Sequence, residues 1–256
     1  MKITLITVCL NSDKTIKETL KSVANQTYKN FEHIIVDGKS SDQTLPIINN
    51  YPHVSKVLSE RDDGVYYAMN KGINLALGDV VGFLNSDDIY ASNDILKNVA
   101  YLFENNSSLD ACYADLVYFN KIDTSKLVRY WKSNKFVKGS FSKGWSPPHP
   151  TFFVRRQVYE RFGNFNLNYS ISSDIELMMR LLEIHKINTM YIPQTWIKMR
   201  MGGLSNKNFK NILKLNKEII YALKKHKLFK NYISYFAYKF FSRFKQFFIY
   251  NKINIV

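Results

Sequence analysis

The sequence predicts an α/β fold with a mostly parallel central sheet, and three observations carry this prediction. Strand-like and helix-like patterns alternate along residues 1–105, which is typical of a parallel sheet covered by helices on both faces. The run 80–84 is wholly apolar, as expected of a central strand buried on both sides. The chain has 256 residues, 46% of them hydrophobic, which suffices for one large domain with an appendage.

The individual elements follow from periodicity and from their flanking residues. Continuous apolar runs mark strands, and apolar residues at three- and four-residue spacing mark helices. Gly78 stands where a glycine often closes a helix. In order, we expect a strand at 2–10, a helix at 16–24, a strand at 31–36, a short helix around 47–48, a strand at 54–59, a helix at 65–77, a strand at 80–84 and a helix at 92–105.

Two further segments in the second half are patterned. Prolines between Trp145 and Val154 fix an extended path into an apolar strand, with His149 beside it. Residues 172–182 predict a capped amphipathic helix with Asp174 in its first turn. The predicted buried stripe of this helix consists of Ile175, Met178, Met179 and Leu182.

Carboxylates follow two of the predicted strands. Asp37 ends the second strand, and Asp87 and Asp88 come directly after the run 80–84. In a parallel sheet these strand ends share one edge, where ligands bind. Adjacent carboxylates repel each other unless a cation or solvent screens them, and Mg²⁺ or Mn²⁺ is commonly held by such oxygens together with substrate phosphates. Capping of the following helix by Asp87 and Asp88 is an equally open interpretation.

Missing motifs and the cysteines narrow the functional class. No Gly-x-Gly-x-x-Gly follows the first strand and no phosphate-binding Gly-x-x-x-x-Gly-Lys-Ser/Thr occurs, which disfavours a dinucleotide dehydrogenase and a P-loop nucleotidase. Cys9 and Cys112 lie in apolar runs and predict reduced, buried thiols in a cytoplasmic protein. The first ten residues imitate a signal peptide, but a buried strand is favoured because no small-x-small cleavage site follows.

Four motifs occur in a fixed order along the chain: Thr7-Val-Cys-Leu-Asn11, Val36-Asp-Gly-Lys-Ser-Ser-Asp-Gln-Thr44, Ser59-Glu-Arg-Asp-Asp-Gly-Val-Tyr-Tyr-Ala-Met-Asn-Lys-Gly72 and Leu84-Asn-Ser-Asp-Asp88. Together they resemble the family 2 glycosyltransferases of the GT-A fold, in the type that assembles bacterial polysaccharides. The resemblance runs from about residue 2 to about residue 200. It implies a Rossmann-like GT-A domain at 1–206, with a nucleotide-sugar-binding half at 1–105 and an acceptor-binding half at 106–206.

The resemblance also implies roles for individual residues. Asp87, with Asp88 beside it and His149, is expected to bind Mn²⁺ or Mg²⁺, although a histidine between prolines is also compatible with a structural role. Lys71 is expected near the donor phosphates, with a solvated helix lysine as the alternative. The donor-binding residues that the resemblance implies are Thr7, Asn11, Asp37, Glu60, Asp62, Asn70, Lys71, Asn85 and Ser86.

The same resemblance implies that Asp174 is the catalytic base. Without the resemblance, its place at the start of a helix fits an ordinary helix cap equally well. Arg180 is expected to brace this helix by a salt bridge. The sequence departs from the family pattern at four positions, and the first three of them leave the identity of the donor open. These are Asn85 in place of an aspartate, Lys39 in place of glycine or alanine, Tyr67 in place of aspartate, and Ser173 in place of an acid.

The positive charge is concentrated in residues 207–256. This tail has twelve Lys or Arg and one acid, Glu218, and so carries +11 of the net charge of +15. It predicts an amphipathic helix with an apolar side and a polar side. We expect it to bind an anionic membrane surface, with packing on the body or on a second subunit as the alternative. The apolar side comprises Ile233, Phe236, Phe240, Phe244 and Phe247, and the polar side comprises Asn231, Ser234, Ser242, Lys245 and Gln246.

The sequence therefore predicts a metal-dependent, inverting glycosyltransferase. Its expected partners are a nucleotide-sugar donor, most simply a UDP-sugar, and a glycan or lipid-linked glycan acceptor, on the inner face of the cell membrane. A homo-oligomer is also compatible with the sequence. A catalytically silent nucleotide-sugar-binding protein and a nucleotidyltransferase stay open as alternatives. Nucleic acid is not an expected partner, because acidic strand ends repel phosphate unless a metal is bound.

Overall fold

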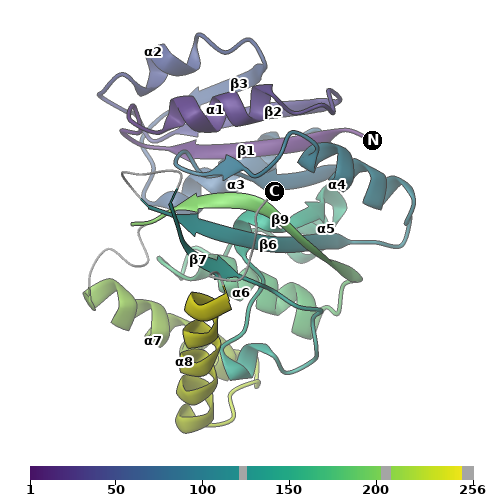
Figure 1. Ribbon diagram of the computed structural model, residues 1–256, viewed down its shortest axis with the longest axis vertical. Coiled ribbons are helices and arrows are strands. Elements are labelled where there is room, and N and C mark those ends of the chain that lie inside the picture. The colour runs from purple at the N-terminus through teal and green to yellow at the C-terminus, as the bar shows by residue number, and fades with distance from the viewer. Residues whose placement is uncertain (121–125, 203–208, 250–256) are drawn as a thin grey trace.

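A single curled sheet forms the centre of the molecule, with helices on both faces (Figure 1). The computed structural model describes residues 1–120, 126–202 and 209–249, without the side chains of residues 243, 245 and 247–249. Strands follow the order β3-β2-β1-β4-β8-β6-β9-β5, and β7 pairs with β6. The predicted α/β fold with a mostly parallel sheet is confirmed. The predicted domain boundary at 206, the tail beyond 249, and the side chains of Lys245 and Phe247 lie outside this description.

The strands are β1 (Ile3–Cys9), β2 (Phe31–Asp37), β3 (Val54–Ser59), β4 (Val80–Phe83), β5 (Ile89–Tyr90), β6 (Ala111–Phe119), β7 (Leu127–Trp131), β8 (Phe153–Arg155) and β9 (Thr189–Arg200). The α-helices are α1 (Ile16–Ala24), α2 (Thr44–Ile48), α3 (Val65–Leu75), α4 (Ile95–Glu104), α5 (Arg156–Phe162), α6 (Ser173–Met179), α7 (Phe209–Lys225) and α8 (Tyr232–Ile249). Two short 3₁₀ turns, η1 (Phe141–Lys143) and η2 (His149–Thr151), and a π-helical turn, η3 (Arg180–Ile184), complete the described elements.

Strand direction places several carboxyl ends on one edge of the sheet. Strands β3, β2, β1 and β4 are mutually parallel, and β9 runs parallel to β6. The short strand β8 lies antiparallel between β4 and β6, so β6 keeps the direction of β4. The ends of β1, β2, β4, β6 and β9 therefore open on the same edge, and the expected ligand site lies there.

Alternating residues of β1 show how the core is divided. Ile3 and Leu5 pack on one face of the sheet with α4, whereas Ile6 and Val8 pack on the other face with α3. This alternation is the two-residue period of a strand covered on both sides. Gly82 in β4 lies directly against the ring of Phe153, because a Cβ at residue 82 would come within 2.2 Å of that ring.

Two predicted helix limits are wrong. Helix α3 ends at Leu75, and Gly78 does not cap it. Gly78 instead passes close to the backbone of β1, where a Cβ would lie 2.7 Å from Thr4 N. The helix expected at 92–105 begins at Ile95, and a short strand that was not expected, β5 at residues 89–90, precedes it and pairs with β9. A short strand of this kind depends on a partner more than a hundred residues away, which local patterns do not show.

The segment 172–182 also differs from the predicted amphipathic helix. It forms α6 and then the π-helical turn η3, and Ser172 at its start makes no side-chain cap to the helix. Met178, Met179 and Leu182 are buried as predicted, but Ile175 is only half-buried and lines a cavity. Leu177 and Glu176 are buried as well, since α7 covers the side expected to face solvent. The salt bridge predicted for Arg180 is present, to Glu176 at 3.2 Å.

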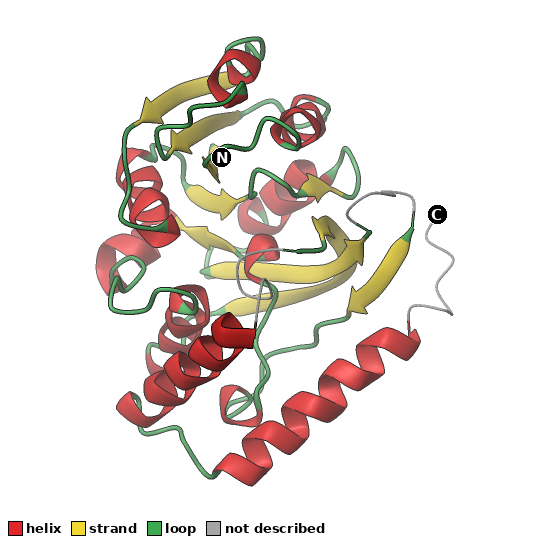
Figure 2. Ribbon diagram, turned by 90° about the vertical axis from the view of Figure 1, so that its left-hand side faces the viewer, coloured by secondary structure: helices red, strands yellow, loops and turns green. Residues whose placement is uncertain are grey.

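The C-terminal helices pack against the rest of the molecule. Leu215 and Ile219 of α7 and Tyr235 of α8 join the same core cluster as the residues of α6. Helix α8 runs along the outside of the sheet end in Figure 2 and contacts β7 and η1. Neither α7 nor α8, nor any other helix within the described ranges, is long and apolar enough to span a membrane.

Helix α8 has its predicted apolar side outward. Tyr235 and Gln246 are buried, and Ser242 lines the cavity described below. The predicted apolar residues with described side chains, Ile233, Phe236, Phe240 and Phe244, are 85%, 45%, 64% and 52% exposed. The predicted apolar side of α8 is therefore not the side that packs on the body.

Candidate active site

A cavity of about 810 Å³ opens at the carboxyl ends of β1, β4, β6 and β9. It continues from these strand ends past η2 and α6 to the inner sides of α7 and α8. Six of the predicted site residues line it: Asp62, Asn85, Ser86, Asp87, His149 and Asp174. The residues expected to bind the donor and the expected base thus line one cavity. Asp62 and Asp174, for example, are 112 positions apart in the sequence.

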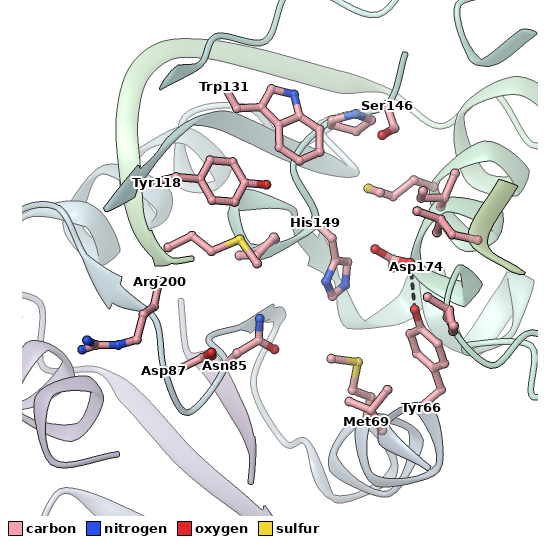
Figure 3. A pocket seen from close by; sticks show the side chains of 18 of the residues that line it. Tyr66, Met69, Asn85, Asp87, Tyr118, Trp131, Ser146, His149, Asp174 and Arg200 are labelled. Atoms are coloured by element: carbon pink, nitrogen blue, oxygen red, sulfur yellow. Dashed lines mark hydrogen bonds between the residues drawn. The ribbon is translucent and has the colours of Figure 1, made fainter. Parts of the chain in front are cut away.

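The carboxylate of Asp174 is held by a residue that the sequence analysis did not select. Tyr66 of α3 donates a hydrogen bond from its hydroxyl to Asp174 Oδ1 at 2.8 Å, as the dashed line in Figure 3 shows. Tyr66 is buried, and its ring stacks on Phe165. Burial and the neighbouring Asp174 charge raise the pKa of Tyr66 well above its usual value, so the phenol stays protonated and donates.

Asp87 and Asp88 are adjacent in sequence but differ in environment. Asp87 lines the cavity, whereas Asp88 is fully buried and accepts hydrogen bonds from Asn85 Nδ2 at 2.9 Å and Arg200 N at 3.3 Å. The amide at residue 85, one of the departures from the family pattern, therefore supplies a donor to a buried carboxylate. An aspartate there would set two like charges against each other.

The negative charge of Asp87 and Asp88 is not fully balanced by neighbouring positive charge. Burial raises the pKa of Asp87, and burial together with the Asp87 charge raises that of Asp88. The Arg200 guanidinium offsets both effects only in part. A divalent cation at Asp87 would lower both pKa values, so this pair fits a metal.

His149 provides a second group that suits a metal or a substrate. Its ring packs against Phe83 and Phe165, at centroid distances of 5.3 and 5.5 Å. Burial lowers its pKa, partly opposed by the charge of Asp174, and a neutral imidazole has a lone pair to offer. In the view of Figure 3, His149 lies between Asn85 and Asp174.

Among the residues that the structure describes, no three His, Cys, Asp or Glu side chains converge as a ready metal site. Asp87 and His149 alone would leave most positions of a six-coordinate Mg²⁺ or Mn²⁺ open. The usual solution for these ions is to take the remaining ligands from substrate phosphates and water. Asp87 and His149 thus fit as ligands of a metal that binds together with a diphosphate.

The acidic loop before α3 is neutralised by a lysine of that helix. Lys71 Nζ lies 2.5 Å from Glu60 Oε1 and 2.8 Å from Asp62 Oδ1. These hydrogen bonds, that to Asp62 first, raise the pKa of Lys71. The predicted contact of Lys71 with phosphate stays a prediction; in this structure the lysine holds the loop that carries Asp62, which lines the cavity.

Four other predicted donor-binding residues are engaged within the protein and do not line the cavity. Asp37 is buried and accepts from Ser40 N at 2.9 Å and from Ser59 Oγ at 2.6 Å. The Thr7 hydroxyl bonds His33 Nε2, Asn11 Oδ1 accepts from Ser41 N, and both ends of the Asn70 amide bond the backbone of Phe165. Their roles in donor binding stay predictions.

The backbone of the loop after β2 explains a glycine at residue 39, but not an alanine. Lys39 has a left-handed backbone with φ 66°, and Asn11, which faces the same loop, has φ 50°. A glycine adopts this conformation freely, whereas a side chain costs of the order of 1 kcal/mol. Asparagine tolerates it better than lysine. The departure at Lys39 is therefore a local backbone cost outside the cavity lining.

The far end of the cavity is aromatic, and sequence reasoning missed it. Tyr118 at the end of β6 and Trp131 at the end of β7 line it. The Arg129 guanidinium lies over both rings, at 4.8 and 5.6 Å, and bonds Gln246 of α8.

Arg200, at the end of β9, lines the cavity beside Asp87 (Figure 3). The strand-end rule that selected Asp87 also selects Tyr118 and Arg200.

An enzyme that acts at the carboxyl edge of a mostly parallel sheet is the class of protein that this fold and this arrangement of carboxylates fit. Residues 4–163 match the family model described as glycosyl transferase family 2, and the chain belongs to this family. A glycosyltransferase of PGL/p-HBAD biosynthesis from Mycobacterium bovis is 31% identical over 208 residues, which cover 79% of this chain and 78% of that protein. The equivalent protein of Mycobacterium tuberculosis gives the same values.

Solved structures support the fold. TarS 1–349 of S. aureus in complex with UDP-GlcNAc has a TM-score of 0.67 at 21% identity, over 87% of this chain and 66% of that one. The mannosyltransferase PcManGT of Pyrobaculum calidifontis, in complex with GDP-Man and Mn²⁺, has a TM-score of 0.63 at 16% identity, over 90% and 65%. This chain thus spans about two thirds of the length of those solved chains. The GT-A fold expected from the sequence is confirmed.

Proposed function

We propose that this glycosyltransferase moves a sugar from a nucleotide-sugar donor, a UDP-sugar, to a hydroxyl of a glycan or lipid-linked glycan acceptor, with inversion at the anomeric carbon. The product belongs to bacterial polysaccharide, lipopolysaccharide or capsule synthesis. One observation carries the proposal: Asp87 and Asp174 line the same cavity, with His149 between the two ends. The solved neighbours in complex with UDP-GlcNAc and GDP-Man support the class of donor.

The proposed reaction needs one base and one stabilised leaving group. Asp174 removes the proton of the acceptor hydroxyl, and the oxygen forms a bond to the anomeric carbon from the side opposite the phosphate. The bond between that carbon and the phosphate oxygen breaks, and the nucleoside diphosphate leaves with the electron pair. Tyr66 keeps Asp174 oriented, since its hydrogen bond occupies Oδ1 and leaves Oδ2 for the acceptor proton.

A divalent metal, Mn²⁺ or Mg²⁺, would be held by Asp87, with His149 as a second candidate and Asp88 behind them. Bound there, it would stabilise the negative charge that develops on the departing diphosphate. Arg200 also contributes positive charge at this end of the cavity, and Asn85 keeps the buried Asp88 in place. The solved structure with GDP-Man and Mn²⁺ supports metal use in this fold.

Nucleotide binding tests the donor and the metal together. We expect one of UDP, GDP, dTDP and CDP to bind the wild-type protein by calorimetry in the presence of Mn²⁺, and much less without it. Asp87→Ala should lose this metal-dependent binding. Asp63→Ala is the control, because Asp63 is an exposed acid of the loop before α3 and does not line the cavity. Binding that is indifferent to Mn²⁺ and to Asp87 would contradict metal dependence.

The outward side of α8 suits the proposed contact with an anionic membrane. Tyr232, Tyr238 and Phe241 are exposed as well, beside the apolar side made by Ile233, Phe236, Phe240 and Phe244. The tail that carries this surface has a net charge of +11, and each basic residue near an anionic leaflet contributes about 1 kcal/mol. Binding there would place the protein on the inner face of the cell membrane, beside a lipid-linked acceptor.

Vesicle flotation tests this contact without deleting core residues. The wild-type protein should float with phosphatidylcholine vesicles that contain phosphatidylglycerol and less with pure phosphatidylcholine. Changing Phe236, Phe240 and Phe244 to serine should release it, whereas Tyr101→Ser, on the exposed side of α4, should not. Unchanged flotation of the triple variant would contradict membrane contact. A shift from dimer to monomer without any flotation would assign this side of α8 to a second copy instead.

A further inference from the structure

An acid of α7 holds the segment that leads into the proposed base. Glu218 accepts five hydrogen bonds from three consecutive residues. Its Oε1 accepts from Ser170 N at 3.1 Å and Ser170 Oγ at 2.8 Å. Its Oε2 accepts from Ile171 N at 3.0 Å and from Ser172 N and Oγ, both at 3.1 Å. One side chain thus fixes the backbone two to four residues before Asp174.

This arrangement replaces the usual local start of a helix. Ser172 occupies the position before α6 where a serine hydroxyl commonly accepts a bond from a helix amide. Here the hydroxyl of Ser172 donates to Glu218, and no side-chain cap is made. Burial opposes the charge of Glu218, yet the bonds from Ile171, Ser170 and Ser172 hold its pKa below the usual value. The entry angle of α6 is therefore set by α7.

A second link ties the same two helices together. His226, directly after α7, lies with its Nε2 3.0 Å from Oε1 of Glu176, which is buried in α6 and also pairs with Arg180. From the opposite side, Tyr66 of α3 bonds Asp174 Oδ1. Asp174 is thus fixed by one direct contact from α3 and by a backbone that α7 holds.

We propose that Glu218 is a positioning residue of the transferase reaction. It does not line the cavity, and it acts by fixing residues 170–172 so that the Asp174 carboxylate meets the acceptor hydroxyl. The C-terminal tail, which the sequence presents as a basic appendage, is then part of the catalytic machinery. This inference rests on the proposed function, because the reaction it serves is the one assigned to Asp174.

Glu218→Gln is the sharpest test. The glutamine keeps the volume and one acceptor oxygen, but its amide NH₂ would face N–H donors, so the contacts of one oxygen are lost. Amide hydrogen exchange at residues 170–172 should become faster. Turnover should fall roughly 10- to 100-fold, since displacement by about 1 Å can cost that much. Binding of the nucleoside diphosphate should be unchanged, because Asp87 and Asn85 are untouched.

Turnover is measured as release of the diphosphate from the sugar-linked form of the nucleotide that binds, with water in place of the acceptor. Glu160→Gln is the matched control, because Glu160 is an exposed acid of α5 that pairs only with Arg156 among the described residues. It should leave both exchange at 170–172 and turnover as in the wild type. If Glu218→Gln fails to fold, Ser170→Ala with Ser172→Ala removes the two hydroxyl contacts and keeps the backbone ones, and a smaller fall in turnover is expected.

Two results would overturn the proposal. The first is a folded Glu218→Gln protein that turns over like the wild type, even if it melts at a lower temperature, because Glu218 would then contribute to stability alone. The second is unchanged exchange at residues 170–172, which would mean that the carboxylate does not hold them in solution. A wild-type protein without turnover on any donor would overturn the proposed function as well. An active wild type beside an equally active variant overturns the positioning role alone.

Discussion

The hydrogen bond from Tyr66 to Asp174 is the contact that most directly shapes the proposed base. A hydrogen bond to a charged group contributes about 1.5–3 kcal/mol. Tyr66→Phe keeps the ring stacked on Phe165 and removes only the hydroxyl. We expect turnover to fall about 10- to 100-fold, with nucleotide binding unchanged. Steady-state kinetics and calorimetry on the same preparation measure both quantities.

Tyr67→Phe is the matched control for this prediction. Tyr67 is the next residue of α3, is 38% exposed and does not line the cavity. Its change should leave turnover within about twofold of the wild type, as is usual for a surface position. Equal turnover in Tyr66→Phe and the wild type would show that Asp174 needs no partner to hold it.

Local sequence patterns predict a site residue only where its position at the end of a strand determines that it reaches the cavity. Asp87 follows from the end of a buried strand, and the structure places it in the cavity as expected for such an end. Tyr66 could not be found in this way, because its contact with Asp174 depends on how α3 meets α6. The same applies to Asp88, whose partner Arg200 N arrives from β9. Tyr66 and Asp88 differ from Asp87 because their contacts come from residues that are distant in the sequence.

At the scale of elements, Gly82 shows how closely β4 and β8 approach. A Cβ at residue 82 would lie 2.2 Å from Phe153 Cε1, and real Cβ atoms do not come so near a ring. Gly82→Ala should therefore lower the free energy of unfolding by about 1–3 kcal/mol, the cost of overpacking a core. Urea unfolding followed by tryptophan fluorescence measures it.

Gly38→Ala serves as the comparison, because a Cβ there meets only ordinary contacts at 3.5 Å and beyond. It should change the unfolding free energy by less than about 0.5 kcal/mol. Equal stability of the Gly82 and Gly38 variants would mean that Phe153 can move aside without cost.

Strands β1, β2 and β4 were predictable because burial on both faces leaves a continuous apolar run, which needs no knowledge of partners. Helices α1 and α3 were predictable in place, since one side of each packs on the sheet. Element ends were less so: β5 forms only against β9, and α6 is covered by α7 on the side that its sequence suggests is exposed. The tail shows the limit most clearly, because periodicity identifies the two sides of α8 but not which one faces the body.

At the scale of the whole molecule, acid should destabilise the fold through His33. Its ring is fully buried between Thr7 and His53, and burial, with a contribution from the charge of His53, lowers its pKa to about 3 from 6.5. Below pH 6.5 the unfolded chain takes up a proton that the folded chain cannot, so stability falls as the pH falls towards 3. Between about pH 7 and pH 5 the loss should be about 2 kcal/mol.

His33→Gln should remove most of this loss, because glutamine does not titrate and can still bond Thr7. His185→Gln is the comparison. The ring of His185 stacks on Phe162, and burial and the Arg180 charge lower its pKa, but the residue is exposed, so this change should recover much less of the loss than His33→Gln. Urea unfolding at the two pH values gives the comparison. A His33→Gln protein that loses as much stability as the wild type would assign the acid sensitivity to other groups.

The whole molecule also explains why one cavity can serve two substrates. The strand ends of the N-terminal half present Asp87 and Asn85, while α6, held by α7, presents Asp174 from the other side. Helix α8 lines the far end with Tyr235, Lys239, Ser242 and Gln246, beside the aromatic rings of Tyr118 and Trp131, and turns its predicted apolar side outward. A donor is thus expected at the sheet edge, and an acceptor between the base and α8.

The role of Asp174 is tested most directly by measuring two quantities for Asp174→Asn: turnover, and binding of the nucleoside diphosphate. Asparagine keeps the size of the side chain and can still accept the bond from Tyr66, but it cannot take a proton. The account predicts that the variant binds the diphosphate with Mn²⁺ as the wild type does, while transfer falls at least about a hundredfold, as expected for loss of a general base. Retained transfer by Asp174→Asn would contradict it, because the proton would then leave by another route.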